Sequence, residues 1–260
     1  MLLRVLAGLA LAALVSLTAQ RAGALTSSGA VAATIAGALA VVAGWDWAAL
    51  LIAYFATSSA LSRLGRGTKE RRTASVVAKH GPRDAWQVAA NGGLFALSAL
   101  AMRIQPDSRW IALGAGSLAA SAADTWATEL GMLYGGAPRS IVTWRVVPVG
   151  TSGGVSAIGT LAALAASGFV AGLVLVFGWI PRIGVAVAIG GVAGALADSL
   201  LGGTLQSRRW CDACNRRTER TVHDCGSVTR HEGGVSWVDN DMVNFLSGAI
   251  GGLVSALLAG

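Results

Sequence analysis

Charge is scarce in this sequence. Only 13% of its 260 residues are charged and 54% are hydrophobic, with a mean hydropathy of +0.61. In a soluble domain about a quarter of the residues are charged, so the composition excludes an ordinary soluble globular protein. The 35 glycines, with abundant alanine, suit helices that pack closely in lipid. We therefore expect an all-α polytopic membrane bundle, with residues 1–260 forming a single integral membrane domain.

Cysteine and histidine are also rare, with three residues of each. The cysteines fall in the spacing Cys211-x2-Cys214-x8-His223-x-Cys225, which supplies a Cys₃His set for a tetrahedral structural zinc ion. An odd number of cysteines in one polar loop argues against a secreted disulfide framework. His231 is an alternative to His223 as the fourth ligand, and three unliganded thiols are the alternative to zinc. Four protein ligands would close the site, so a catalytic zinc ion is not expected.

Eight apolar segments approach the roughly 20 residues needed to cross a bilayer. They cover residues 3–19, 26–44, 46–62, 87–102, 110–129, 154–178, 184–205 and 241–259. The first segment also fits a signal peptide, but Leu2 and Leu3 bring it close to the length of a spanning helix, which we prefer. Several segments are short, so counts of seven or nine stay open. The polar connection 206–240 is expected to be a small cytoplasmic loop that carries the zinc clip.

Lys and Arg are distributed unevenly between the two sides of such a bundle. Cytoplasmic loops of membrane proteins carry an excess of these residues. With eight spans, 16 of the 20 fall on one side, and only Arg4, Arg103, Arg109 and Arg182 fall on the other. This pattern predicts that both termini lie outside the cell and that the long loops lie in the cytoplasm. We expect the membrane to be a bacterial cell membrane. The pattern also places the active face on the cytoplasmic side.

Acidic residues are few, yet five of them lie at the ends of predicted spans on that side. A carboxylate close to hydrocarbon is costly unless it is paired, bound to metal or hydrated, so each is a candidate functional group. They are Asp124, Glu129, Asp198, Asp239 and Asp241. Mg²⁺ takes one or two carboxylates together with substrate phosphates, which makes these residues candidate magnesium ligands. The alternative is that each carboxylate pairs with an arginine at the membrane interface.

The same order of motifs occurs twice. Asn91-Gly92-Gly93 opens one predicted span, and Ala123-Asp124-Thr125 ends the next. Ser152-Gly153-Gly154 and Ala197-Asp198-Ser199 repeat this arrangement. Glycine-rich sequences match easily by chance, so a duplication and a coincidence both remain open. A duplication would place a binding site where the two halves meet.

The most cationic segment lies between residues 65 and 93. Arginine presents a planar fork suited to phosphate, and lysine supplies a point charge. The candidate phosphate-binding residues of this segment are Lys69, Arg71, Lys79 and Arg83, with Asn91 at the head of the following span. The alternative is a positively charged loop that sets topology and touches anionic lipids.

A second candidate for anion binding is the short stretch Thr151, Ser152 and Gly153. We expect it at the start of the sixth span, where hydroxyls, free N–H groups and the helix dipole favour an anion. An ordinary N-cap with flexible glycines is the alternative. The P-loop motif G-x-x-x-x-G-K-[ST] is absent from the sequence, so a P-loop nucleotide site is excluded.

Several blocks of the sequence resemble the signature blocks of one membrane family, which contains transmembrane protein 19 and the plastid phytyl-phosphate kinase. The blocks are SAADTWATELG, PRSIVTWRVVPVGTSGGVSAIGT, ALADSLLGGTLQ and VDNDMVNFLSG. The segment GTKERRTASVVAKHGPRDAWQVAANGG resembles the cationic loop of the family. The resemblance covers nearly the whole chain beyond the first predicted span. The cysteine cluster departs from the eukaryotic members.

The resemblance implies a kinase that converts an isoprenoid monophosphate lipid, such as phytyl phosphate, to its diphosphate with a nucleoside triphosphate, CTP or ATP. The positions that match the family blocks are Lys69, Arg83, Asp124, Glu129, Asp198, Asp239, Asn240, Asp241 and Asn244. We expect Asp124 and Asp198 to hold Mg²⁺. Lys69, Arg71 and Arg83 are expected to offset the charge of the transferring group, since phosphoryl transfer depends on positioning and electrostatics. Asn240 and Asn244 are expected to contact substrate.

A transporter for an ion or an anionic solute is the alternative reading, because a duplicated pair of helices with buried carboxylates also suits a carrier. The two functions predict different positions for the charged residues. In a carrier these residues lie near the bilayer midplane, whereas here they are expected at one end of their spans. The motif D-G-x2-A-R of phosphotransferases that use cytidine diphosphate lipids is absent. Membrane lipids are expected partners, and nucleic acid is not.

Overall fold

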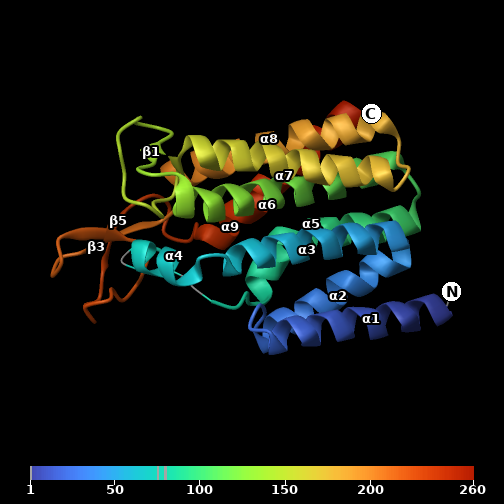
Figure 1. Ribbon diagram of the computed structural model, residues 1–260, viewed down its shortest axis with the longest axis horizontal. Coiled ribbons are helices and arrows are strands. Elements are labelled where there is room, and N and C mark those ends of the chain that lie inside the picture. Colours follow the sequence, from blue (N-terminus) through green and yellow to red (C-terminus); the bar gives the residue numbers. More distant parts are fainter. Residues whose placement is uncertain (1, 75, 79–80) are drawn as a thin grey trace.

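The computed structural model describes residues 2–74, 76–78 and 81–260, and this part of the chain is mainly helical (Figure 1). Its helices are α1 (Leu2–Arg21), α2 (Ser27–Ala43), α3 (Trp45–Arg63), α4 (Arg66–Thr73), α5 (Ala85–Ile104), α6 (Ser108–Tyr134), α7 (Ala157–Val176), α8 (Pro181–Thr204) and α9 (Asn240–Ala259). Its strands are β1 (Arg139–Ser140), β2 (Gly154–Val155), β3 (Arg208–Cys211), β4 (Arg216–Thr218) and β5 (Arg230–Gly233).

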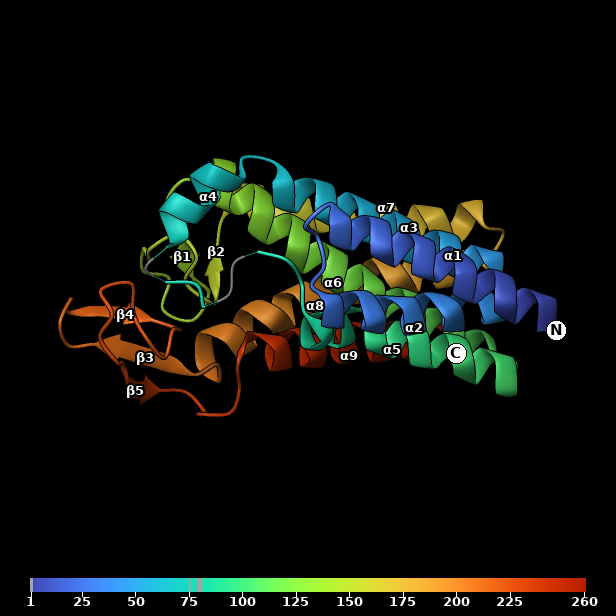
Figure 2. The same ribbon diagram turned by 90° about the horizontal axis from the view of Figure 1, so that it is seen from below.

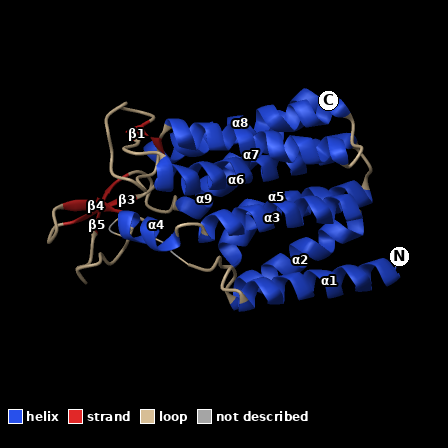
Figure 3. Ribbon diagram, in the orientation of Figure 1, coloured by secondary structure: helices blue, strands red, loops and turns tan. Residues whose placement is uncertain are grey.

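The long helices run side by side, and α4 and all the strands of the described chain gather at one end of them (Figures 2 and 3). We call this end the loop end. Both termini lie at the opposite end (Figure 1), as a chain with an even number of crossings requires. The connections at the loop end carry most of the Lys and Arg residues, so the two ends of the bundle differ in charge as expected.

The predicted all-α membrane bundle is confirmed, whereas the number of spans stays a prediction. Within the described residues, α5, α7, α8 and α9 are long and apolar enough to cross a membrane. A fifth span results if α3 and α4, which are bent by 70° at their junction, count together. The helices α1 and α2 are apolar, but the apolar parts Val5–Arg21 and Ser27–Ala43 are shorter than these helices. Helix α6 is long, but it contains the charged residues Asp124 and Glu129.

Small residues bring the central helices together. On α6, every residue from Gly114 to Ala123 is buried, against α5, α7, α8 and α9. A Cβ atom on Gly194 of α8 would lie 2.3 Å from the Cβ atom of Ala120, so this helix crossing tolerates only glycine there. Close backbone approach of this kind is how helices associate in lipid, where the hydrophobic effect between them is weak.

Two predicted helix boundaries are wrong. The sixth span was expected to start at residue 154, but Gly154–Val155 pairs with Arg139–Ser140 as strands β2 and β1, and Ser156 caps α7 by accepting from the Gly159 N–H. The fifth span was expected to end at residue 129, but α6 continues to Tyr134. Asp124 therefore lies ten residues from the end of α6, about 15 Å at 1.5 Å per residue, which is deeper than expected.

The connection between α8 and α9 is more than a loop. It forms a three-stranded antiparallel sheet in the order β4-β3-β5, at the loop end of the bundle (Figure 2). We call residues 206–239 the sheet module. The module contains all three cysteines of the sequence.

Candidate functional site

A polar cavity of about 620 Å³ opens between the helices at the loop end. Its lining comes from α3 to α9, from the connections around residues 23–24, 77–83 and 149–156, and from the sheet module. Thirteen of the candidate site residues line it: Lys69, Arg83, Asn91, Asp124, Glu129, Thr151, Ser152, Gly153, Asp198, Asp239, Asn240, Asp241 and Asn244. Side chains from separate parts of the sequence therefore share one cavity. Arg71 is not among them, and Lys79 lies outside the described residues.

Asp124 on α6 and Asp198 on α8 form the centre of the cavity. Their carboxyl groups lie within hydrogen-bonding reach of each other. The Ser247 Oγ donates to Asp198 Oδ2 at 3.2 Å. None of the described Lys or Arg side chains forms an ion pair with either residue. Two carboxylates so close repel each other unless a proton or a cation lies between them, so the pair is a candidate cation site.

Lys69 and Glu129 form an ion pair. The Lys69 Nζ donates to Glu129 and also to the carbonyl oxygens of Leu61, at 2.8 Å, and Ser62, at 3.0 Å. All three N–H donors of the ammonium group are used, and the side chain is nearly buried. The structure therefore gives Lys69 the part of a positioning residue that holds α4 against α3 and α6. Its predicted phosphate contact and the predicted metal contact of Glu129 are not supported.

The other cations of α4 differ in their contacts, and one of them, Arg72, also docks this helix. Arg72 donates to the carbonyl oxygens of Met132 and Leu133, at 2.8 and 3.1 Å, where α6 leaves carbonyls unpaired near its C-terminus. Arg71 is exposed outside the cavity and reaches only Thr68. The predicted role of Arg71 in phosphate binding is therefore not supported, because its side chain does not face the site.

Arg83 is a cation that lines both the polar cavity and the adjoining apolar pocket, with neutral hydrogen-bond partners. Its two terminal nitrogens donate to the hydroxyls of Ser59 and Ser62 on α3, at 3.0 and 3.1 Å. The guanidinium carbon lies 6.0 Å from the centre of the Phe55 ring, a weak cation–π contact. A phosphate is a better acceptor for the guanidinium than a neutral hydroxyl, because both partners are then charged and the contact can be bidentate.

The backbone of Arg83 is held rigidly. Its N–H donates to the Ala24 carbonyl and its carbonyl accepts from the Thr26 N–H, both at 3.0 Å, which pairs it with the turn between α1 and α2. A Cβ atom on Gly29 would lie 2.1 Å from the Arg83 carbonyl oxygen, so glycine is required at the start of α2. The cation is therefore positioned by the first two helices, which the sequence motifs did not connect with the site.

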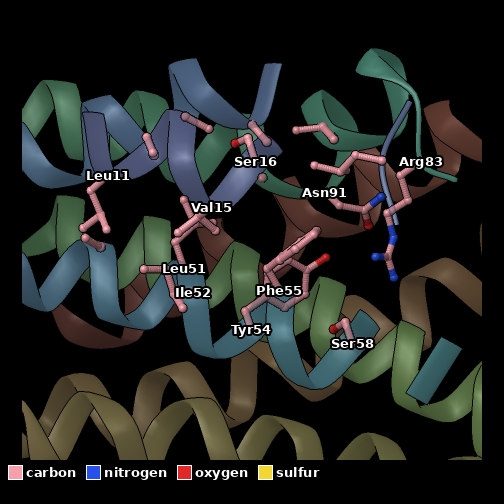
Figure 4. A pocket seen from close by; sticks show the side chains of 18 of the residues that line it. Leu11, Val15, Ser16, Leu51, Ile52, Tyr54, Phe55, Ser58, Arg83 and Asn91 are labelled. Carbon is pink, nitrogen blue, oxygen red and sulfur yellow. The ribbon is translucent and has the colours of Figure 1, made fainter. Parts of the chain in front are cut away.

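An apolar slot adjoins the polar cavity, and Figure 4 shows its lining side chains. Side chains of α1, α2, α3 and α5 form it, and Leu11 lies at the end far from Arg83 and Asn91. Tyr54, Arg83, Gln87 and Asn91 line both the slot and the cavity. The slot has a volume of about 90 Å³. An apolar space with a cation at its mouth suits part of a lipid chain below an anionic head group.

The stretch Thr151, Ser152 and Gly153 lies in a loop and not at a helix start, so its predicted action through a helix N-terminus is wrong. Gly153 has φ of +76° in this loop, and a Cβ atom there would lie 2.5 Å from the Cα atom of Gly203 on α8. The Ser152 hydroxyl donates to Glu219 of the sheet module. Burial raises the pKa of Glu219, and the hydrogen bond from Ser152 offsets part of this effect. The stretch therefore joins the cavity wall to the sheet module.

The five predicted magnesium ligands do not form one ligand set. Among the described residues, only the cysteine cluster brings three or more ligating atoms within 4.8 Å of one another. Glu129 pairs with Lys69, and Asp239 Oδ1 accepts from the Met242 N–H at 3.0 Å as the N-cap of α9. Asp241 also lines the cavity, but Asp124 and Asp198 are the predicted ligands that lie next to each other.

Several cavity residues were not predicted. Tyr54 lies beside Thr125 and within electrostatic reach of Arg83 and Asp124. The sequence offered no signal for Tyr54, because it sits in an apolar span without a motif. Thr125 belongs to the block SAADTWATELG, so its place next to Asp124 in sequence could have revealed it.

Comparisons with known proteins agree with this architecture. Protein PGR of Arabidopsis thaliana is 31% identical over 94% of this chain and 92% of its own length. An uncharacterized membrane protein of Synechocystis sp., sll0875, is 37% identical over 64% of this chain and 65% of its own length. The chloroplastic protein VTE6 of Arabidopsis thaliana is 29% identical over 80% of this chain, but this match covers 57% of VTE6. No solved structure matches the chain.

The sequence profile of a whole family also matches, over residues 10–252. This range includes the whole of α2 to α8 and the sheet module, together with parts of α1 and α9. The resemblance seen in the sequence blocks is thereby confirmed: the chain belongs to the DUF92 family of integral membrane proteins.

Proposed function

We propose that this protein is a membrane kinase that transfers a phosphoryl group from a nucleoside triphosphate to an isoprenoid monophosphate lipid, giving the diphosphate. The observation that carries the proposal is the junction of the two spaces. Arg83 lies where the apolar slot meets the polar cavity, and the pair Asp124 and Asp198 faces the same cavity. The resemblance of the sequence blocks to a family that contains a phytyl-phosphate kinase supports this choice of reaction.

The lipid acceptor would use the slot. Its chain would lie among the apolar side chains of α1, α2, α3 and α5, and its monophosphate would meet the guanidinium of Arg83. The space holds the first part of an isoprenoid chain, and the remainder would extend into the bilayer. Gln87 and Asn91 at the junction offer amide groups to the phosphate or to the first carbons of the chain.

The nucleotide phosphates would occupy the polar cavity beside Asp124 and Asp198. These two carboxylates fit a magnesium ion, which takes one or two carboxylates along with substrate phosphates and would offset the phosphate charge. Asn240 and Asn244, at the start of α9, line the cavity and can donate amide hydrogens to phosphate oxygens.

The reaction needs no strong base. An oxygen of the acceptor monophosphate attacks the γ-phosphorus of the donor, the bond from that phosphorus to the bridging oxygen breaks, and a nucleoside diphosphate leaves. The attacking oxygen is already anionic, so catalysis depends on holding two polyanions in line and reducing their repulsion. Arg83 serves this need on the acceptor side, and the carboxylate pair with its cation serves it on the donor side.

The loop end would face the cytoplasm, where nucleoside triphosphates are found. The excess of Lys and Arg in the connections at this end supports that orientation. We place the protein in a bacterial cell membrane on the same argument, with CTP or ATP as the donor.

One observation favours the alternative function, a transporter. Asp124 lies ten residues inside α6, closer to the middle of the helix than expected. The cavity nevertheless opens among the loops of one end, and none of the buried residues from Gly114 to Ala123 of α6 lines it. We therefore favour a site reached from the loop end alone.

Purified protein incubated with Mg²⁺, γ-labelled CTP or ATP and a panel of isoprenyl monophosphates tests the proposal. Labelled isoprenyl diphosphate is the expected product, and Asp198→Asn should abolish it. Asp107→Asn is the matched control, because Asp107 pairs with Arg109 at the opposite end of the bundle. No labelled lipid from any acceptor, together with solute flux in proteoliposomes, would overturn the kinase and favour the transporter.

A further inference from the structure

The sheet module has almost no apolar core of its own. Among residues 206–239, all of which the structure describes, Cys211 and Val238 are the buried hydrophobic residues, and Val222, Val228 and Trp237 are exposed. A segment of this size cannot fold on hydrophobic burial alone and needs a disulfide, a metal or a partner surface. Some interaction other than apolar packing must therefore hold the strands and turns of the module together.

The three cysteines and His223 meet in one place although they come from two different turns. Cys211 ends β3, and Cys214 lies in the tight turn to β4, where Asn215 takes a left-handed φ of +53°. His223 and Cys225 lie in a second turn, which the His223 N–H closes by donating to the Ser227 carbonyl at 2.9 Å. The four ligating atoms all lie within 4.8 Å of one another.

The distances match a tetrahedral metal site. A zinc–sulfur bond of about 2.3 Å places two thiolates of a tetrahedron about 3.8 Å apart. Here the sulfur atoms of Cys211 and Cys225 are 3.6 Å apart, and the Nδ1 of His223 is 3.3 Å from the sulfur of Cys225. A disulfide would need sulfur atoms about 2.0 Å apart. Cys211 and His223 are both buried. The spacing therefore favours a metal over an oxidised pair.

We infer that Cys211, Cys214, His223 and Cys225 bind a structural zinc ion that holds the sheet module against the cytoplasmic mouth of the polar cavity. The three thiols release their protons on binding, so the occupied site carries a net charge of −1. The geometry selects His223 over the sequence alternative His231, which is exposed on β5 and lies outside the cluster.

The zinc site brackets the segment that contacts the bundle. Between Cys214 and His223, the Glu219 N–H donates to the Val76 carbonyl at 2.9 Å, and the Arg220 Nε donates to the Val77 carbonyl at 3.0 Å. The Glu219 carboxyl accepts from Ser152, so this short segment joins two loops of the cavity wall. A metal ion that fixes both ends of the segment therefore fixes the wall of the cavity.

Metal analysis of the full-length protein, purified under reducing conditions and supplied with zinc, tests the site. We expect about one zinc ion per chain, with the absorption of thiolate-to-metal charge transfer after replacement by cobalt. Cys214→Ser and His223→Ala should lose the metal, and His231→Ala should keep it as the matched control. Iron in place of zinc, retention of zinc by Cys214→Ser, or a disulfide found under non-reducing conditions would overturn the inference.

Limited proteolysis tests the mechanical role separately. A chelator should open residues 206–239 to cleavage while circular dichroism shows that the bundle keeps its helices. An unchanged cleavage pattern after complete zinc removal would contradict the role in holding the wall. Neither measurement uses phosphoryl transfer, so the zinc inference and the proposed kinase can fail independently.

Discussion

The apolar slot and the polar cavity share Tyr54, Arg83, Gln87 and Asn91 but are built in opposite ways. The slot comes mainly from α1, α2, α3 and α5, with aliphatic side chains and a single cation at its mouth. The cavity comes from helix ends and loops at the loop end, with carboxylates, amides and hydroxyls. The slot is therefore suited to an apolar chain and the cavity to charged groups. Arg83 lines both spaces and connects them.

The largest effect is expected at the carboxylate pair. Asp124→Asn or Asp198→Asn removes a charge that the proposed magnesium ion needs, and such a loss costs several kcal/mol, or on the order of 10³-fold in kcat. Activity assays on folded protein, with Asp107→Asn as the control, provide the measurement. A variant within tenfold of the unmodified protein would show that the cavity does not perform the chemistry.

The next largest effect is expected at the shared residue. Arg83→Gln should lower kcat/KM by about 10², because it removes a cation from the acceptor phosphate. Arg83→Lys should restore only part of this loss, since lysine lacks the planar fork. If Arg83→Gln instead raised only the KM for the donor nucleotide and left the KM for the lipid unchanged, Arg83 would bind the nucleotide in the cavity. It would then not bind the acceptor phosphate at the mouth of the slot.

Lys69 should affect stability more than chemistry. Lys69→Met leaves the partly buried Glu129 without its partner, and removal of one member of such an ion pair costs up to about 3 kcal/mol. Thermal unfolding in detergent should show this loss, and adding Glu129→Gln should recover part of it. A Lys69→Met protein of unchanged thermal stability that has lost all activity would instead make Lys69 catalytic.

The smallest effect is expected in the slot. Leu11→Trp should fill the end far from Arg83 and lower kcat/KM about fivefold for long isoprenyl chains relative to short ones, about 1 kcal/mol. Leu14→Trp is the matched control on the same helix, because its side chain is 64% exposed. Equal effects of both variants on all chain lengths would remove the slot from the acceptor site.

Local patterns predicted the helices well and their partners poorly. Asp84 and Gln87 form the capping box that starts α5, which is the kind of signal a sequence carries in neighbouring residues. The docking of α4 is different, because the pairing of Lys69 with Glu129 joins residues 60 positions apart. A sequence shows that a cation is present but not which acceptors surround it. The sequence therefore predicted Lys69 and Arg71 as phosphate ligands but not the contacts that the structure gives them, with Glu129 and Thr68.

The amino-acid sequence by itself determined the class of the protein. Scarce charge, long apolar segments and glycine-rich helices dictate a helical membrane bundle, because only helices satisfy backbone hydrogen bonds in lipid. The sequence also marked Asp124, Asp198 and the cysteine cluster as groups that need a partner. Only the tertiary structure decided which groups meet. It set Asp124 against Asp198, paired Lys69 with Glu129 in the cavity wall and placed Arg83 at the mouth of the slot, because packing between distant helices fixes these contacts.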